Sequence, residues 1–376
     1  MIKPVISKVA CVTALGSDPQ CLWQGLLAGR SGIAKLQRFS CENYVSSLAA
    51  SIDDLALPVG GSRLDPLLEQ IADQLGEIPQ NTQLVLASTK GEVDKLELAC
   101  RAGERLPAAL LFDPLIAKVA KRFGLRDVGL NINAACASST IALARGAAMI
   151  ATGQAESVLV YAADIVSEFV FSGFSALQAL SNEPCKPFDA NRKGLTLGEA
   201  GVALLLMSEE SALRQQSRPL ATIAGWGAAN DAHHVTAPAR DGSGLILACR
   251  AALQKAAVAA EQIAAINAHG TATVYNDAME LTAFNQLFAD QLPPIHGIKG
   301  SLGHCLGAAG GVETLIAGYA LQQQLIPGTV GCVQPEAAGE GHVSLQSQPI
   351  CGDYLLTTNS GFGGVNAALI LQRITL

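Results

Sequence analysis

Short apolar segments alternate with longer, alanine-rich segments along most of the chain. The short segments predict strands, whereas the longer ones have helical character. The predicted strands are residues 6–11, 84–87, 128–133, 157–161, 202–207, 221–226, 264–268, 342–346, 354–359 and 367–371. The predicted helices are residues 18–28, 66–75, 107–123, 138–152, 244–257, 276–288 and 307–324. Strands separated by helices indicate a layered α/β fold.

A polar stretch at residues 208–219 follows a strand that has the composition of a buried one. This stretch is the best candidate for a junction between two similar halves, residues 1–215 and 216–376. Because no flexible Gly/Ser linker separates them, we expect two halves of one fold and not independently folding domains.

Composition narrows the range of functions. Of the 376 residues, 49% are hydrophobic and only 15% are charged, which indicates a compact protein with a large core. The net charge of −7 argues against sequence-independent binding of nucleic acid, which needs clustered cations. One small basic cluster is a candidate contact for an acidic partner, and it consists of Lys118, Lys121, Arg122 and Arg126.

Cysteine usage and hydropathy indicate the compartment. The ten cysteines are scattered without Cys-x-x-Cys or Cys/His ligand spacing, so we expect no metal site. No apolar run approaches the ~20 residues that a membrane-spanning helix needs. The first residues lack the charged-then-apolar layout of a secretion signal. We therefore expect a cytoplasmic protein with free thiols.

Cys136 has a distinctive position in the sequence. It follows the apolar segment 129–133, has small residues on both sides and precedes the helix-compatible segment 141–152. At such a junction the sulfur lies near free backbone N–H groups and the positive end of a helix dipole, which favours thiolate over thiol. Most cysteines are inert packing residues, but this setting predicts a nucleophile.

Two histidines lie in segments of small residues and glycines. His269 opens the segment His-Gly-Thr-Ala-Thr, and His304 lies in Gly-His-Cys-Leu-Gly-Ala-Ala-Gly-Gly. The glycines allow backbone and substrate to approach closely. Lys299 can hold a charge near the histidines, and Glu313 on the following helix needs a partner if it is buried. With a loop cysteine, these residues predict a catalytic site.

Taken together, these motifs resemble the elongating β-ketoacyl-acyl-carrier-protein synthases of the thiolase-like superfamily. The matching segments are Val-Thr-Ala-Leu-Gly at 12–16, Ala-Cys-Ala-Ser at 135–138, Gly-Phe-Ser-Ala-Leu-Gln-Ala-Leu-Ser at 173–181, Pro-Phe-Asp-Ala-Asn-Arg-Lys-Gly at 187–194, Asp-Ala-His-His-Val-Thr-Ala-Pro at 231–238, His-Gly-Thr-Ala-Thr at 269–273 and Gly-Phe-Gly-Gly-Val-Asn at 361–366. Several ordered motifs over nearly the whole chain make this match specific. The resemblance implies a layered αβαβα thiolase-like fold built from two similar halves.

The resemblance also implies a reaction, a decarboxylative Claisen condensation on carrier-protein thioesters. Cys136 would hold the acyl chain, while His269 and His304 hydrogen-bond to the malonyl thioester oxygen. The backbone N–H groups of Cys136 and Phe362 would form the oxyanion hole, with Phe362 also acting as a gate. Lys299 and Glu313 would orient the histidines and balance their charge. The implied substrate-binding residues are Thr271 and Thr273 at the phosphopantetheine arm, Phe174 at the acyl tunnel, and His234.

The implied partners are an acyl carrier protein and a second ketosynthase-like subunit, identical or homologous. No metal or redox cofactor is implied, because the phosphopantetheine belongs to the carrier. Departures from the usual motifs, such as Ala272 in place of Gly or Ser, indicate an altered substrate pocket. The pathway is therefore fatty-acid synthesis or a specialised polyene or polyketide-like lipid synthesis.

Two other functions stay open at this point. A length-setting or scaffold subunit would shape the tunnel of a partner without condensing anything, although the presence of Cys136 and both histidines argues against it. A cysteine-dependent acyltransferase or thioesterase would form the acyl-enzyme but pass the acyl group to water or to another acceptor.

Overall fold

The structure is a computed structural model, which describes residues 2–53, 55, 60–104 and 112–374. In the first half of the chain the main strands are β1 (Pro4–Thr13), β4 (Gln83–Ala87), β5 (Leu130–Asn131), β6 (Ser157–Asp164) and β8 (Ala200–Ser208). In the second half they are β9 (Thr222–Asn230), β10 (Ile263–Asn267), β11 (Ile295–His296), β14 (Tyr354–Gly361) and β15 (Val365–Gln372). Smaller strands are β2 (Ala34–Lys35), β3 (Leu48–Ala50), β7 (Leu197–Gly198), β12 (Leu325–Ile326) and β13 (Gln348–Pro349).

The main strands join in the order β11-β10-β14-β15-β9-β1-β8-β6-β4-β5, five from each half. From the centre outwards, each set has two antiparallel pairings followed by two parallel ones. The two sets meet between β1 and β9, where Val5 pairs with Thr222. This repeated pattern confirms the prediction of two similar halves, whereas the boundary at 215/216 stays a prediction.

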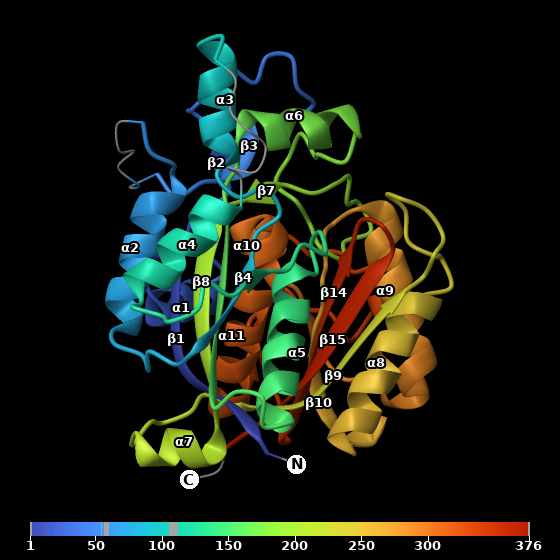
Figure 1. The fold of residues 1–376 in the computed structure, drawn as a ribbon. Helices are drawn as coiled ribbons and strands as arrows, with labels where there is room; N and C mark the ends of the chain where they lie inside the picture. The colour runs from blue at the N-terminus through green and yellow to red at the C-terminus, as the bar shows by residue number, and fades with distance from the viewer. Residues whose placement is uncertain (1, 54, 56–59, 105–111, 375–376) are drawn as a thin grey trace.

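The larger helices form three layers around these strands, and two of the smaller ones lie apart, near β2, β3 and β7 (Figure 1). Their bounds are α1 (Pro19–Leu27), α2 (Leu64–Leu75), α3 (Val93–Arg101), α4 (Asp113–Arg122), α5 (Ser138–Ala151), α6 (Glu168–Ala176), α7 (Glu209–Arg214), α8 (Ser243–Ala256), α9 (Val274–Phe288), α10 (Lys299–Leu302) and α11 (Ala309–Gln323). Helices α5 and α11 contact each other and strands of both sets, so they form the central layer. Helices α2 and α4 cover the first set, and α8 and α9 cover the second. The predicted αβαβα architecture is therefore confirmed.

The central layer depends on the small and apolar residues of its two helices. Almost every residue of α11 is buried, as expected for a helix that is apolar all round. The core between the two sets of strands includes residues of α5, α11, β6, β8 and β15. Its position matters for function because α5 begins directly after Cys136 and the segment between α10 and α11 carries His304.

Three local predictions need correction. Residues 342–346 do not form a strand, and only Val343 makes an isolated bridge, with Ile295. The segment that carries Phe174, for which no helix is predicted, is the helix α6. Of the predicted helix 107–123, residues 113–122 are helical, and 107–111 lie outside the described residues.

The basic cluster is also less available than the sequence indicates. Lys118 contacts the carboxylates of Asp65 and Glu92. Arg122 pairs with Glu69 and Asp73, each at 2.6 Å. Two of the four cations are therefore balanced within the chain. Within the described part of the chain, none of the helices is both long and apolar enough to cross a membrane.

Candidate active site

Cys136 lies in a tight bend just before α5. The preceding residue, Ala135, has a left-handed backbone with φ of 49°. The hydroxyl of Ser138, at the start of α5, donates to the carbonyl of Ala135 at 2.5 Å and accepts from the N–H of Ala134 at 2.9 Å. The side chain that opens the helix therefore also fixes the bend, and the sulfur faces the cavity described below.

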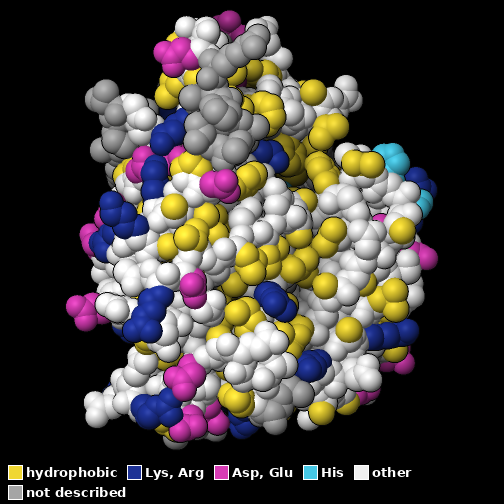
Figure 2. Space-filling model, in the orientation of Figure 1, with side chains coloured by type: hydrophobic (Ala, Val, Ile, Leu, Met, Phe, Trp, Pro, Cys, Tyr) yellow, Lys and Arg dark blue, Asp and Glu magenta, His cyan; other side chains and the backbone are white. Residues whose placement is uncertain are grey.

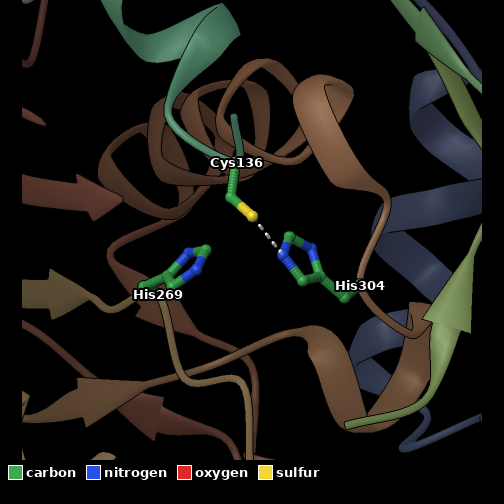
Figure 3. A group of neighbouring side chains, drawn as sticks. All are labelled: Cys136, His269 and His304. Atoms are coloured by element: carbon green, nitrogen blue, oxygen red, sulfur yellow. Dashed lines mark hydrogen bonds between the residues drawn. The ribbon is translucent and has the colours of Figure 1, made fainter. Parts of the chain in front are cut away.

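His304 approaches Cys136 from another segment of the chain (Figure 3). Its Nε2 lies 2.9 Å from the Cys136 sulfur. The backbone N–H of His304 donates to the carbonyl of Thr196 at 2.7 Å, and its carbonyl accepts from the N–H of Gly198 at 3.0 Å. These contacts with the β7 region hold His304 in place although it lies in a loop. Its Nδ1 has no hydrogen-bond partner among the residues that the structure describes.

His269 follows the end of β10 and faces the same space, with its ring 5.2 Å from that of His304 between centroids. Its Nδ1 lies 3.0 Å from the Asn359 amide nitrogen and 3.2 Å from the Lys299 ammonium nitrogen. The same amide nitrogen donates to Glu313 Oε2 at 2.6 Å, which fixes the orientation of the Asn359 side chain. Both neighbours of Nδ1 are therefore donors, so Nδ1 accepts and the ring proton lies on Nε2.

Lys299 and Glu313 form a buried ion pair behind His269. The ammonium group lies 2.5 Å from Glu313 Oε1, and both side chains are almost fully buried. Lys299 also donates to the backbone carbonyl of His269. Burial raises the pKa of Glu313, while the Lys299 charge and the Asn359 amide oppose that rise. The pair therefore fixes the orientation of His269 without touching the cavity itself.

The charge states of the reactive groups follow from burial. Burial raises the pKa of the Cys136 thiol to about 11, although the Lys299 charge and the backbone N–H of Phe362 act in the opposite direction. Burial, followed by the Lys299 charge, also lowers the pKa of His269 and His304 well below their usual value. At neutral pH the site therefore holds a thiol and two neutral imidazoles. The expectation that this setting favours a thiolate at Cys136 is wrong, because desolvation outweighs the opposing Lys299 charge and the Phe362 N–H.

A cavity of about 320 Å³ brings most of the sequence-predicted residues together. Its lining includes Cys136, His269, His304, Thr271, Thr273, Phe174, Phe362 and His234. The rings of Phe174 and Phe362 stack with centroids 5.7 Å apart. His234 is exposed, with Nδ1 3.2 Å from the N–H of Thr236. The two other aromatic residues of α6 do not line the cavity, since Phe171 is buried in the apolar cluster against which Phe174 packs and Phe169 is exposed.

The turn between β14 and β15 reaches Cys136 because of one glycine. A Cβ on Gly361 would lie 3.0 Å from the carbonyl oxygen of Ala134 and 3.1 Å from the nitrogen of Cys136. A side chain at this position would push these backbone atoms away by a few tenths of an ångström, so glycine suits the close approach. The approach brings the N–H of Phe362 to the sulfur, as the predicted oxyanion hole requires.

Cys136, His269 and His304 also place three potential metal ligands within 4.8 Å of one another. A metal-bound histidine normally donates its other ring N–H to an acceptor. Here the Nδ1 of His269 faces two donors, Asn359 and Lys299. This arrangement suits a histidine that donates from Nε2 to a substrate oxygen better than one that binds a metal ion.

Asn359 is a residue of the site that the sequence reasoning missed. It orients His269 and Glu313, and its side-chain oxygen accepts from the Thr140 hydroxyl on α5. Asn359 lies in β14, two residues before Gly361, and the sequence interpretation considered only the backbone N–H groups of the turn that follows this strand. Glu280 on α9 was missed too, and it accepts the N–H groups of His269 and Gly270 at 2.7 Å each.

Comparison with known proteins agrees with this geometry. Residues 114–212 match the model of the beta-ketoacyl synthase N-terminal domain, and residues 220–333 match that of the C-terminal domain. The two matches together cover more than half of the chain. The chain therefore belongs to the beta-ketoacyl synthase family, a family of condensing enzymes, and the resemblance drawn from its motifs is confirmed.

Individual relatives match over almost their whole length. The chain is 29% identical over 414 residues to 3-oxoacyl-[acyl-carrier-protein] synthase 2 of Vibrio cholerae, which covers 98% of this chain and 99% of that protein. It is similar to the ishigamide ketosynthase/chain length factor, with 26% identity, a TM-score of 0.91 and full coverage of both chains. It is also similar to the ketosynthase ApeO in complex with its chain length factor ApeC from Xenorhabdus doucetiae, with 25% identity, a TM-score of 0.81 and coverage of 99% and 98%.

Proposed function

We propose that this protein is a β-ketoacyl-acyl-carrier-protein synthase that condenses an acyl chain held on Cys136 with a malonyl unit. One observation carries the proposal. At one cavity, the Cys136 thiol lies 2.9 Å from His304 Nε2, and a second histidine, His269, is oriented as an N–H donor. A hydrolase needs only a nucleophile and a base. A second histidine held as a donor serves a step that builds negative charge on a substrate oxygen.

In the first half-reaction the Cys136 sulfur attacks the carbonyl carbon of an acyl thioester on the carrier. The thiol proton moves to His304 Nε2 and then to the departing carrier thiolate, because the lowered pKa of His304 disfavours a lasting imidazolium. The N–H groups of Cys136 and Phe362 stabilise the oxyanion, a contact worth about 2.7–4 kcal/mol per donor. The products are acyl-Cys136 and the free carrier thiol.

In the second half-reaction a malonyl thioester replaces the first carrier. Its bond to the terminal carboxylate breaks, CO₂ leaves, and the electron pair forms an enolate whose oxygen accepts from His269 Nε2–H. The enolate carbon attacks the acyl-Cys136 carbonyl, the sulfur–carbon bond breaks, and the cysteine recovers a proton from solvent. The product on the carrier is a β-ketoacyl chain that is two carbons longer.

The two histidines differ in a way that suits these two steps. Asn359 and Lys299 fix His269 as a donor at Nε2. His304 lacks a partner at Nδ1 within the described residues, so its ring proton can lie on either nitrogen. His304 can therefore accept a proton from Cys136 in the first step and donate to the thioester oxygen in the second.

We also propose how the chain is assembled and where it works. The halves 1–215 and 216–376 supply the nucleophile and the histidines, respectively. Leu130 on the edge strand β5 is 40% exposed, and Val128 just before this strand is 54% exposed. Hydrophobic side chains gather at the centre of the face on which α5 lies (Figure 2). An open apolar edge of this kind suits pairing with a second subunit, identical or homologous.

All ten cysteines are free, which suits the cytoplasm.

The proposed substrates are supported by the named relative, whose name describes it as a synthase of 3-oxoacyl-[acyl-carrier-protein]. We propose an acyl carrier protein as the partner and no tightly bound cofactor beyond its phosphopantetheine. The two similar ketosynthases are named together with chain length factors. This favours specialised polyene or polyketide-like synthesis as the pathway, with fatty-acid synthesis as the alternative.

The test is mass spectrometry of the purified protein given an acyl-carrier protein alone and then malonyl-carrier protein. We expect an acyl adduct on Cys136 that is consumed when a β-ketoacyl product and CO₂ appear, and no adduct on Cys136→Ala. An adduct that is released to water without malonyl decarboxylation would favour the acyltransferase or thioesterase. Full pathway output from Cys136→Ala with its partner subunit would favour the length-setting subunit.

A further inference from the structure

We propose that Arg192 is a positioning residue that holds segment 271–274 in the shape needed to bind the pantetheine arm of the carrier. The inference rests on the proposed function, because it assigns Thr271 and Thr273 to that arm. It concerns the motif at residues 187–194, to which the condensation chemistry itself gives no role.

Arg192 is a buried residue whose guanidinium group contacts three segments of the chain, around residues 189, 273 and 336. Its side chain is only 4% exposed. The guanidinium group donates to the carbonyl of Val274 at 2.8 Å and to that of Thr273 at 3.3 Å. It also donates to the carbonyl of Asp189 at 3.0 Å and lies 2.6 Å from the carboxylate of Glu336. The planar fork of an arginine can serve all these acceptors at once, which the single ammonium group of a lysine cannot.

Asp277 acts with Arg192 from the first turn of α9, at 3.8 Å from its guanidinium group. Its carboxylate accepts the N–H of Phe188 at 2.7 Å and that of Ala272 at 3.1 Å. Both of these residues have left-handed backbones, with φ of 62° and 66°. This conformation is strained for residues other than glycine and persists only where the surroundings enforce it.

The two strained segments pack directly against each other. A Cβ on Gly270 would lie 2.9 Å from the ring of Phe188, so the glycine allows this contact. The N–H of Gly194 donates to the carbonyl of Ala272 at 3.1 Å. Segments 187–194 and 270–274 therefore behave as one unit, and the buried charges of Arg192 and Asp277 lie inside it.

This unit forms one wall of the cavity. Thr271 and Thr273 line the cavity with their hydroxyl oxygens 2.9 Å apart, and Lys193 and Gly194 line it from the other segment. If the backbone of this segment could rotate freely, the hydroxyls of Thr271 and Thr273 would not keep a fixed direction toward the cavity. Arg192 prevents this by holding the carbonyl of Thr273, one of the two residues that carry these hydroxyls.

The test compares wild-type protein with Arg192→Lys, which keeps the charge but loses the fork. The first readout is calorimetric binding of malonyl-carrier protein that has an amide in place of the thioester. We expect Kd to rise about tenfold, the usual effect of losing one hydrogen bond to a charged group. The second readout is condensation with malonyl methyl thioester, which has no pantetheine arm, and here we expect kcat/KM to change less than about twofold, since the lost contact is worth nothing to this substrate.

A matched control is Arg214→Lys, because Arg214 lies on α7 in exposed ion pairs with Glu210 and Glu156. It should leave both readouts unchanged. Alkylation of Cys136 by iodoacetamide should be the same in all three proteins, which shows that the nucleophile is intact. If Arg192→Lys does not fold, Glu336→Gln is the second variant. It weakens the ion pair of Arg192 with a side chain that is one-third exposed, and it should also raise Kd.

Folded Arg192→Lys with wild-type Kd would overturn the proposal. An equal loss with the methyl thioester would also overturn it, because the damage would then be general. The binding readout does not need condensation. A wild-type protein that does not condense, with the Kd difference preserved, would contradict the proposed function and still support the role of Arg192.

Discussion

Replacing Asn359 by aspartate should reverse the hydrogen-bonding role of His269 with almost no change in shape. The amide nitrogen that now lies 3.0 Å from His269 Nδ1 becomes a carboxylate oxygen, which accepts instead of donating. The new carboxylate oxygen also lies beside Glu313 Oε2, which now accepts from the amide at 2.6 Å, and Lys299 still donates to His269 Nδ1. Where the new carboxylate wins Nδ1 against Lys299, His269 places its proton on Nδ1 and leaves Nε2 as an acceptor. The Thr140 hydroxyl can still donate to the other oxygen, so the side chain keeps its anchor on α5.

The magnitude follows from the loss of one donor to the enolate oxygen. Removing a donor of this kind costs about 2.7–4 kcal/mol, or a factor of roughly 10²–10³ in rate. Malonyl decarboxylation should fall by this factor in Asn359→Asp. Acylation of Cys136 transfers a proton to His304 and does not involve His269. The rate of acylation should therefore change less than about tenfold, which corresponds to a change in activation free energy of less than about 1.4 kcal/mol.

The assay measures CO₂ release from malonyl-carrier protein and, separately, the rate of the acyl adduct on Cys136 by mass spectrometry. Asn359→Ala removes the amide but leaves Lys299 as a donor to Nδ1, so it should reduce decarboxylation less than Asn359→Asp does. Asn81→Asp, at an exposed position in the turn before β4, is the matched control. Equal decarboxylation by the aspartate and alanine variants would refute the reasoning, as would an equal fall in both half-reactions.

Three further predictions concern charge and burial. Glu313→Gln leaves the buried Lys299 unpaired, so unfolding by urea should show a loss of about 3–5 kcal/mol, whereas the exposed Glu210→Gln should show almost none; equal effects would contradict the buried-pair argument. Because the pKa of Cys136 is raised to about 11, its alkylation rate should keep rising with pH through pH 9, and a plateau below pH 8 would show a resting thiolate. Burial lowers the pKa of His296 to about 3, and neither ring nitrogen has a partner in the described ranges. The unfolded chain therefore binds a proton at His296 that the folded chain does not, so this residue should lower stability by up to about 1.4 kcal/mol per pH unit as pH drops below 6.5. His269 and His304 add to the loss, so His296→Leu should reduce the slope of stability against pH without abolishing it; an unchanged slope would count against this reasoning.

Much of the site could be predicted because its residues stand in short, ordered motifs. Cys136, His269 and His304 come from segments far apart in the chain, yet each motif is local and the family resemblance links them. Asn359 was missed because its role depends on a contact with His269 at long range, which no local pattern encodes. The prediction of a thiolate at Cys136 was wrong for a related reason, because the whole fold determines how deeply the sulfur is buried.

The fold was predictable where apolar spacing and length agreed, as in α5 and α11. It failed at α6, whose sequence Glu-Phe-Val-Phe-Ser-Gly-Phe-Ser-Ala combines aromatic residues, a valine and a glycine, all poor helix formers. Ser167 caps this helix by accepting the N–H of Val170, and Phe171 anchors it in a buried apolar cluster. Tertiary packing therefore overrides local propensity there.

The most direct test of the central claim is a single turnover of isolated acyl-Cys136 enzyme. The acylated protein is freed of carrier and mixed with malonyl-carrier protein that carries ¹³C at C2 of the malonyl group. We expect a β-ketoacyl-carrier product with ¹³C at C2, unlabelled CO₂, and loss of the acyl group from Cys136 at the same rate. Release of the acyl chain as a free acid, with the malonyl group intact, would contradict it.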